Sequence, residues 1–208
     1  EYLDGPLLIV AGAGSGKTKV LTSRIAHIIK KNRAFPNQIL AVTFTNKAAK
    51  EMQLRVSKLL RKDATGLPWL GTFHSISAKL LRKHADAVGL KSNFSIIDQD
   101  DQVRLIKNIC KAENVDIKKI SPKFILAIID KWKNKGFYPQ DVILKRKDPL
   151  EKNFLSIYKI YQEKLVNLNS ADFSDLILHT LKIFEKYTDI AELYSKKFKY
   201  ILVDEYQD

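Results

Sequence analysis

The chain has 208 residues and carries 36 lysines and arginines against 23 aspartates and glutamates, which gives a formal net charge of +13 and a pI near 9.6. Such a charge suits a polyanionic partner, and the single cysteine, Cys110, excludes an internal disulfide framework and fits an apolar core position. No apolar stretch approaches the roughly 20 residues of a membrane span and no secretory segment opens the chain, so we expect a cytoplasmic protein in a reducing compartment.

Apolar periodicity predicts short strands that alternate with helices over the first hundred residues, with one more strand near the end. The predicted buried strands are 7–10, 39–44, 69–73 and 199–203. The predicted helices are 17–31, 46–62 and 75–88. A short apolar run at 94–97 is either one more strand or an extended entry segment. Alternation of this kind is typical of an α/β fold, with a parallel sheet flanked by helices.

From Gln99 to about Asn169 the pattern changes to helices only. The predicted spans are 99–113, 121–134, 139–146 and 151–168. Start signals at Ser121-Pro122 and Tyr138-Pro139 separate them. About 70 residues suffice for a small helical domain with its own core, particularly one that packs against the domain into which it is inserted. We therefore expect an inserted helical domain at 99–169, between a first part at 1–98 and a return at 170–208.

The most informative motif is Ala-Gly-Ala-Gly-Ser-Gly-Lys-Thr at 11–18, directly after the first apolar run. A buried strand that leads through a Gly-rich turn into a helix is the phosphate-binding P-loop, although its strict pattern has Gly where this chain has Ala11. Glycines let successive N–H groups face an anion, and the following helix adds its dipole. The alternative is a structural turn. The predicted nucleotide-binding residues are Gly12, Ala13, Gly14, Ser15, Gly16, Lys17, Thr18 and Lys19.

A second apolar run, at 200–203, leads into Asp204-Glu205-Tyr206-Gln207-Asp208. Ligands of open parallel sheets bind beyond the carboxyl ends of the strands, so these carboxylates and the Gly-rich turn are expected in one crevice. One acidic residue there would complete a Mg²⁺ site, and another would orient the attacking water. Together the two motifs predict ATP hydrolysis.

Three more phrases lie between these motifs in a fixed order. They are Ile-Leu-Ala-Val-Thr-Phe-Thr-Asn-Lys-Ala-Ala-Lys-Glu-Met at 39–52, Gly-Thr-Phe-His-Ser at 71–75 and Ala-Asp-Phe-Ser-Asp at 171–175. With the P-loop and the acidic end, this set closely resembles the superfamily 1A DNA helicases of the UvrD/Rep/PcrA type. The resemblance covers essentially the whole chain and implies a RecA-like P-loop motor domain 1A with an inserted domain 1B.

The resemblance also implies an activity and assigns roles to residues. It implies an ATP-dependent motor that moves 3′ to 5′ on single-stranded DNA in repair or replication, which would make the protein nucleoid-associated. It places Lys17 on the transferred phosphate, Glu205 on the hydrolytic water and Gln207 near the γ-phosphate, with Thr18 and Asp204 around Mg²⁺. Lys19 stands where relatives often carry Arg against adenine, and it lacks a planar stacking face.

The resemblance further implies a single-strand track at two strand-to-helix turns, where an aromatic ring can stack on a base. The expected contacts are Phe44, Thr45, Asn46, Lys47, Phe73 and His74. Local structural roles compete with this assignment. Thr45 or Asn46 could cap a helix, Phe44 could lie in the core, and His74 could sit beside a cap made by Ser75.

Other residues have a structural and a functional interpretation. Trp69 and Trp132 fit core packing. Asp172 and Asp175 fit a helix cap and a first-turn anion, while the resemblance suggests that they support the DNA-binding region locally. The insert also carries many basic residues, including the run Lys145-Arg146-Lys147. They fit either a solvated surface or a surface that contacts the phosphates of duplex DNA.

The chain begins at Glu1 and ends inside the metal-binding motif, so we expect a fragment. In this family an adenine-recognising glutamine motif lies upstream, and a second motor domain with arginine fingers lies downstream. The expected partners are single-stranded DNA, single-strand/duplex junctions and that second domain, and the isolated fragment should be nearly inactive. Two alternatives are the motor core of a helicase–nuclease subunit and a non-translocating DNA-binding ATPase.

Overall fold

The computed structural model describes residues 5–10, 12, 14–61, 66–115, 120–144 and 149–206. These residues form two compact units, one of Glu1–Ile76 with Asp189–Asp208 and one of Ser77–Thr188. The domain boundaries expected from the sequence, after 98 and after 169, remain predictions. No helix in the described ranges is long and apolar enough to cross a membrane.

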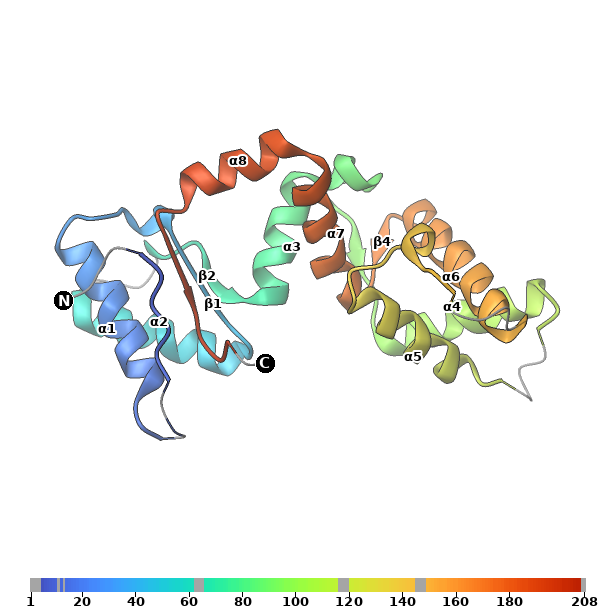
Figure 1. The fold of residues 1–208 in the computed structure, drawn as a ribbon, viewed down its shortest axis with the longest axis horizontal. Helices are drawn as coiled ribbons and strands as arrows, with labels where there is room; N and C mark the ends of the chain where they lie inside the picture. Colours follow the sequence, from blue (N-terminus) through green and yellow to red (C-terminus); the bar gives the residue numbers. More distant parts are fainter. Residues whose placement is uncertain are drawn as a thin grey trace. The chain divides into compact units, whose positions relative to one another are not determined.

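The first unit is built on a parallel sheet, as the alternating pattern predicts (Figure 1). Its described strands have the order β2-β1-β5. Ala41 pairs with Leu70 on one side and with Leu202 on the other. The strands are β1 (Ile39–Thr43), β2 (Leu70–Thr72) and β5 (Tyr200–Val203). A mixed α/β fold with a parallel sheet is therefore confirmed.

Two helices of this unit cover one face of the sheet and close its core. Ile25 and Ile28 of one helix and Met52 of the other pack against Ile39 and Leu202 of the strands. The described helical segments of the unit are α1 (Lys17–Lys30), the 3₁₀ turn η1 (Pro36–Gln38), α2 (Asn46–Leu60) and α8 (Thr188–Lys197), which begins at the unit boundary. Trp69 is buried edge-on against Tyr194 and Phe198, so its prediction as a core residue is confirmed.

The predicted buried strand at 7–10 is wrong. Residues 7–10 form no strand in the structure, and Leu8 and Val10 are 72% and 89% exposed. On the last described strand, Ile201 is also exposed. A short apolar run becomes a buried strand only where a neighbouring strand takes its backbone hydrogen bonds and a helix covers its side chains. The described part of the chain supplies neither for residues 7–10.

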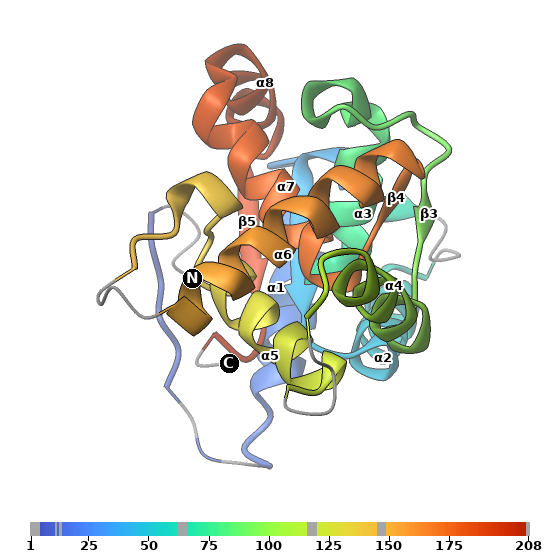
Figure 2. The same ribbon diagram turned by 90° about the vertical axis from the view of Figure 1, so that its right-hand side faces the viewer.

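The second unit is mainly helical. The helices α4, α5 and α6, labelled in Figure 2, share one hydrophobic core, which includes Ile106, Ile129 and Tyr158. Cys110 is fully buried there and Trp132 stacks on Tyr158, so both core predictions are confirmed. The longer helices are α3 (Phe73–Lys83), which begins in the first unit, α4 (Gln99–Ala112), α5 (Pro122–Lys133), α6 (Pro149–Asn167) and α7 (Phe173–Lys186).

Shorter elements complete this unit. The 3₁₀ turn η3 (Ala85–Val88) follows α3, and β3 (Ser95–Ile96) pairs in parallel with β4 (Ser170–Ala171). The helix predicted at 139–146 is wrong within the described residues, because only the 3₁₀ turn η4 (Pro139–Asp141) forms. Its Asp141 carboxylate accepts a bond from the Tyr138 N–H at 3.0 Å, and Ile143 beyond it is 88% exposed. Without an apolar face to bury, a short segment does not hold a helix.

Candidate nucleotide and nucleic-acid site

The Gly-rich turn leads directly into α1. The Ser15 backbone N–H and hydroxyl both donate to the Gly12 carbonyl oxygen, at 3.3 and 2.6 Å. Gly14 and Gly16 have φ angles of +74° and +94°, a region that residues with a Cβ seldom adopt. Of the predicted turn residues, Ala13 lies outside the described residues, as does Ala11.

The first turn of α1 is open to an anion. Gly16 precedes it without a side-chain cap, and no acidic residue lies in the first turn of this 14-residue helix. The free N–H groups and the helix dipole therefore both favour a negative group at this end. Lys17 and Lys19 add positive charge in the same turn. The arrangement suits a phosphate.

The acidic end of β5 lies against this turn. The Thr18 hydroxyl donates to Asp204 Oδ2 at 3.4 Å, and Lys17 Nζ lies 3.9 Å from Glu205 Oε2. The Asp204 N–H donates to the Val42 carbonyl oxygen at 2.9 Å and so continues the ladder beyond β5. The structure thus brings together four of the predicted site residues. Gln207 lies outside the described residues.

The two carboxylates differ in their surroundings. Asp204 is buried, and burial raises its pKa, to which the charge of Glu205 adds, while the Thr18 hydroxyl and Lys17 act in the opposite direction. Glu205 is about one-third exposed and has a φ of +54°. Backbone strain of this kind in a non-glycine residue gathers at functional sites.

Thr18 and Asp204 fit a magnesium ion. Mg²⁺ prefers hard oxygen ligands, and proteins usually hold it through one or two carboxylates together with substrate phosphates and waters. A hydroxyl and a buried carboxylate within hydrogen-bond distance, beside a phosphate-binding turn, form such a donor set. Within the described ranges no group of three or more His, Cys, Asp and Glu could hold a metal by itself.

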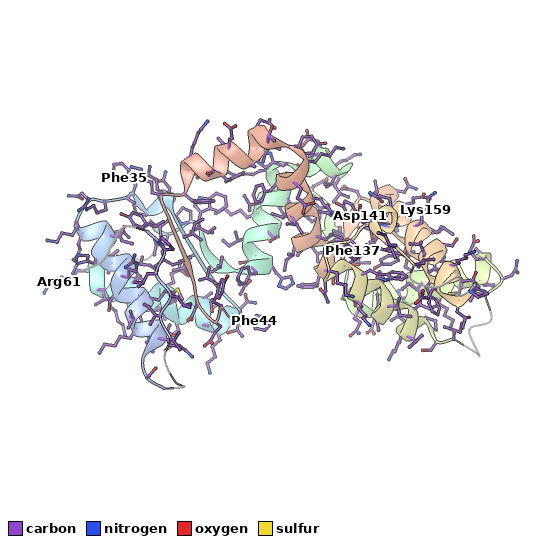
Figure 3. The ribbon with its side chains drawn as sticks, in the orientation of Figure 1. Phe35, Phe44, Arg61, Phe137, Asp141 and Lys159 are labelled. Atoms are coloured by element: carbon purple, nitrogen blue, oxygen red, sulfur yellow. The ribbon has the colours of Figure 1, made fainter. Side chains whose placement is uncertain are left out.

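Phe44 follows the carboxyl end of β1 and is 61% exposed, so the core interpretation of this residue is wrong (Figure 3). Thr45 caps α2, because its side chain accepts a bond from the Ala48 N–H at 3.1 Å. Asn46 and Lys47 are exposed in the first turn. Helix capping explains the role of Thr45 alone. The side chains of Phe44, Asn46 and Lys47 are exposed at the surface and have no such local role.

Phe73 and His74 follow the end of β2. Phe73 is 40% exposed, and His74 is half-buried, which lowers the pKa of its imidazole and favours the neutral form. The expectation that Ser75 provides the cap is wrong, because the Thr72 hydroxyl accepts the Ser75 N–H at 3.2 Å. Since Thr43 pairs with Thr72, Phe44 and Phe73 leave the same edge of the sheet from adjacent strands.

A buried ion cluster in the second unit was missed by sequence reasoning. Lys133 Nζ lies 2.6 Å from Asp172 Oδ2 and 2.7 Å from Asp175 Oδ1, and all three side chains are buried. Burial opposes the charge on Lys133, but the two carboxylates prevail and raise its pKa. Tyr161 also donates to Asp172 at 2.9 Å. The predicted cap is confirmed, since Asp172 and Asp175 form a capping box on α7.

A cleft of about 930 Å³ opens in the second unit. We call it the lysine cleft, because its lining includes Lys152, Lys159, Lys182 and Lys186. Lys182 pairs with Asp141 at 3.0 Å, whereas Lys159, labelled in Figure 3, is exposed. The run Lys145-Arg146-Lys147 lies outside the described residues, so its expected contact with duplex DNA remains a prediction.

The fold and the site together define a protein with a parallel α/β domain, a glycine-rich turn that suits an anion and an acidic strand end that suits a metal ion. A family profile for the UvrD/REP helicase N-terminal domain matches residues 1–208, and the chain belongs to this family.

Curated relatives agree with this assignment. The chain is 48% identical over 210 residues to a probable DNA helicase II homolog of Rickettsia conorii, covering all of the chain and 32% of the relative. It is 45% identical over 205 residues to the ATP-dependent DNA helicase PcrA of Staphylococcus epidermidis, covering 99% of the chain and 28% of the relative. PcrA of Staphylococcus aureus gives the same identity and coverage. The chain thus spans about a third of the length of these relatives.

Proposed function

We propose that the chain is the ATP-binding part of a DNA helicase that moves 3′ to 5′ on single-stranded DNA, in repair or replication. The contact between Thr18 and Asp204 carries the proposal, because it joins the anion-binding turn to the acidic strand end. Phe44 and Phe73 are exposed beside the ends of the neighbouring strands. In the same proposal the first unit belongs to a P-loop motor domain 1A, and the helices at 99–169 form its insert 1B.

The proposed nucleotide chemistry assigns one task to each side chain. The turn at Gly14 and Gly16 and the start of α1 would hold phosphate oxygens, and Lys17 would neutralise charge that develops on the transferred phosphate. Thr18 and Asp204 would hold Mg²⁺, which when bound supplies Lewis-acid stabilisation of phosphate charge.

Glu205 would orient the attacking water and take up its proton. Its contact with Lys17 spans 3.9 Å, and both side chains are about one-third exposed. Such a loose, partly solvated ion pair contributes little free energy, so it separates at low cost. A phosphate in the turn would draw Lys17 away, leaving the Glu205 carboxylate available for the water.

The proposed DNA track lies at the carboxyl edge of the same sheet. Exposed aromatic rings at Phe44 and Phe73 can each stack on a base, at about 1–3 kcal/mol per base, while Asn46 and Lys47 can meet phosphates. His74, half-buried beside Phe73, would contact the strand in its neutral form. Because β1 pairs with β5 on one side and with β2 on the other, a movement at the nucleotide would reach the DNA-contacting residues through the sheet.

The proposed partners follow from this track. They are single-stranded DNA, single-strand/duplex junctions and a second motor domain of the full-length protein, which would close on the nucleotide. The lysine cleft of the second unit would contact duplex phosphates.

Strand displacement by the full-length protein tests the proposal. Duplexes with a 3′ or a 5′ single-stranded tail are mixed with the protein, ATP and Mg²⁺, and Lys17→Ala is the inactive control. We expect displacement from the 3′-tailed substrate only. Displacement from the 5′-tailed substrate would contradict the direction, and ATP hydrolysis without displacement from either would identify a non-translocating ATPase.

A further inference from the structure

Thr43 is the last residue of β1, which lies between β2 and β5 in the sheet. Its hydroxyl has no evident role within the described structure. Its side chain is 1% exposed, and its Oγ1 is buried without a hydrogen-bond partner among the described residues. In the described part of the chain, the only other buried side-chain oxygen or nitrogen without a hydrogen-bond partner is Gln162 Oε1, in the second unit. An unsatisfied buried hydroxyl costs about 1–3 kcal/mol, so a valine of the same shape would serve packing better.

The strand register places this hydroxyl beside the acidic strand end. Val42 pairs with Val203 and the Asp204 N–H continues the ladder to Val42, so Thr43 is adjacent to Asp204. On its other side Thr43 pairs with Thr72. Thr43 is thus the middle member of a row of polar side chains at three strand ends.

The alternation of side chains along each strand shows to which face of the sheet Thr43 and Asp204 point. Ile39 on β1 and Leu202 on β5 point into the core made with α1 and α2. Residues two positions apart share a face, so Thr43 and Asp204 point to that same side of the sheet. Thr18 reaches Asp204 there from the first turn of α1.

The neighbouring polar groups already have partners within the protein. Thr72 accepts the Ser75 N–H, and Asp204 accepts the Thr18 hydroxyl. Adjacent strands lie about 4.8 Å apart, which leaves side-chain oxygens on them at a separation that one water can bridge. A hydrated cation held by Thr18 and Asp204 brings such waters, whose protons need acceptors.

We propose that Thr43 is a positioning residue of the Mg²⁺ site, where its hydroxyl hydrogen-bonds a water of the ion's hydration shell next to Asp204. This inference rests on the proposed function and adds a residue to its metal site. Groups that orient a metal's ligands typically change metal affinity by about 10–100-fold when removed. Thr43→Val keeps the shape and removes the hydroxyl, and Thr43→Ser keeps the hydroxyl.

The test measures ADP binding to the full-length protein, with Mg²⁺ and with EDTA. We expect Thr43→Val to weaken binding on the order of 10-fold in Mg²⁺ and to leave binding in EDTA unchanged. Thr43→Ser should restore the Mg²⁺-dependent part. Equal affinity of Thr43→Val and wild type in Mg²⁺, or failure of Thr43→Ser to restore binding, would overturn the inference.

Stability separates this role from a structural one. Thr180 is also buried, but its hydroxyl donates to the Leu176 carbonyl oxygen at 2.8 Å, so Thr180→Val is the matched control. In EDTA, Thr180→Val should lower Tm, whereas Thr43→Val should not, because no bond within the described protein is lost. A Tm loss for Thr43→Val equal to that of Thr180→Val would also overturn the inference. Lys17→Ala should weaken ADP binding in both conditions, and its failure to do so would count against the proposed function itself.

Discussion

The Thr18 hydroxyl donates a hydrogen bond to Asp204 Oδ2 across 3.4 Å, although 186 positions separate the two residues in the chain. The contact places the first turn of α1 beside the end of β5. Because α1 begins at the Gly-rich turn, the same contact brings the N–H groups proposed to bind phosphate close to the carboxylate proposed to bind the metal. The candidate site thus depends on sheet topology as much as on either motif.

Lys17 and Glu205 should separate binding from turnover in the full-length protein. Lys17→Ala should lower the DNA-stimulated ATPase rate by at least about 10²-fold, because it removes positive charge from the transition state. Glu205→Gln should retain nucleotide binding and lose turnover. Steady-state ATPase assays and nucleotide titrations measure both effects.

Lys30 provides the control for these variants. It is exposed at the far end of α1, so Lys30→Ala removes a charge from the same helix and should change neither measurement. Near-normal ATPase in Lys17→Ala or Glu205→Gln would refute the assignment of the site.

Phe44→Ala should weaken binding of single-stranded DNA by about 1–3 kcal/mol through loss of stacking, with little change in the salt dependence. Phe35 gives a matched control, since it is 73% exposed but precedes β1 at the opposite end of the strand (Figure 3). Fluorescence anisotropy over a range of salt concentrations measures both variants. Equal losses in Phe44→Ala and Phe35→Ala would show that the proposed track does not involve this edge specifically.

The sequence was most informative where local chemistry determines structure. The Gly-rich turn, the start of α1 and the strand before Asp204 all follow from residue types at fixed spacing, and the structure has them. The error at 7–10 has a different origin. An apolar run shows that a segment can be buried, but burial depends on a neighbour that the run itself does not specify.

The ion cluster of the second unit shows the same limit. The sequence predicts that Asp172 and Asp175 form a local cap, and they do form one. Their partner Lys133 comes from another helix, 39 and 42 positions away. One signal was present, because Lys133 continues the spacing of Ile125 and Ile129 and so falls on the buried face of α5.

Lys133→Met should destabilise the second unit by about 3–5 kcal/mol, because it leaves the Asp172 and Asp175 carboxylates buried without their cation. Lys131→Met is the control, since Lys131 is exposed on the same helix and should change stability little. Urea denaturation of the full-length protein gives the comparison. If both variants unfold at the same urea concentration as wild type, the cluster does not contribute as its burial indicates.

His179 should make the stability of the second unit depend on pH. Burial lowers the pKa of its imidazole below the ordinary 6.5, and Nδ1 lies 2.5 Å from the Tyr138 hydroxyl. The folded state therefore disfavours the proton that the unfolded state accepts. This contribution is complete above pH 6.5 and is lost as the pH falls below that value. Tm measured from pH 7.5 to about 5 should fall less steeply in His179→Gln than in wild type, and parallel curves would count against this role.

The lysine cleft should contribute to binding of duplex DNA through charge. Lys152→Ala combined with Lys159→Ala removes two exposed cations from α6 that line the cleft, whereas Lys107→Ala with Lys111→Ala removes two exposed cations from α4 outside its lining. Each phosphate contact contributes about 0.9 to the slope of log K against log salt for duplex DNA. The cleft pair should therefore reduce that slope by up to about 2 on substrates with a junction, and should change binding of single strands less. Because both pairs alter the net charge equally, the α4 pair measures the non-specific part. An equal reduction of the slope by both pairs would show that the duplex responds to overall charge and that the cleft has no particular contact with it.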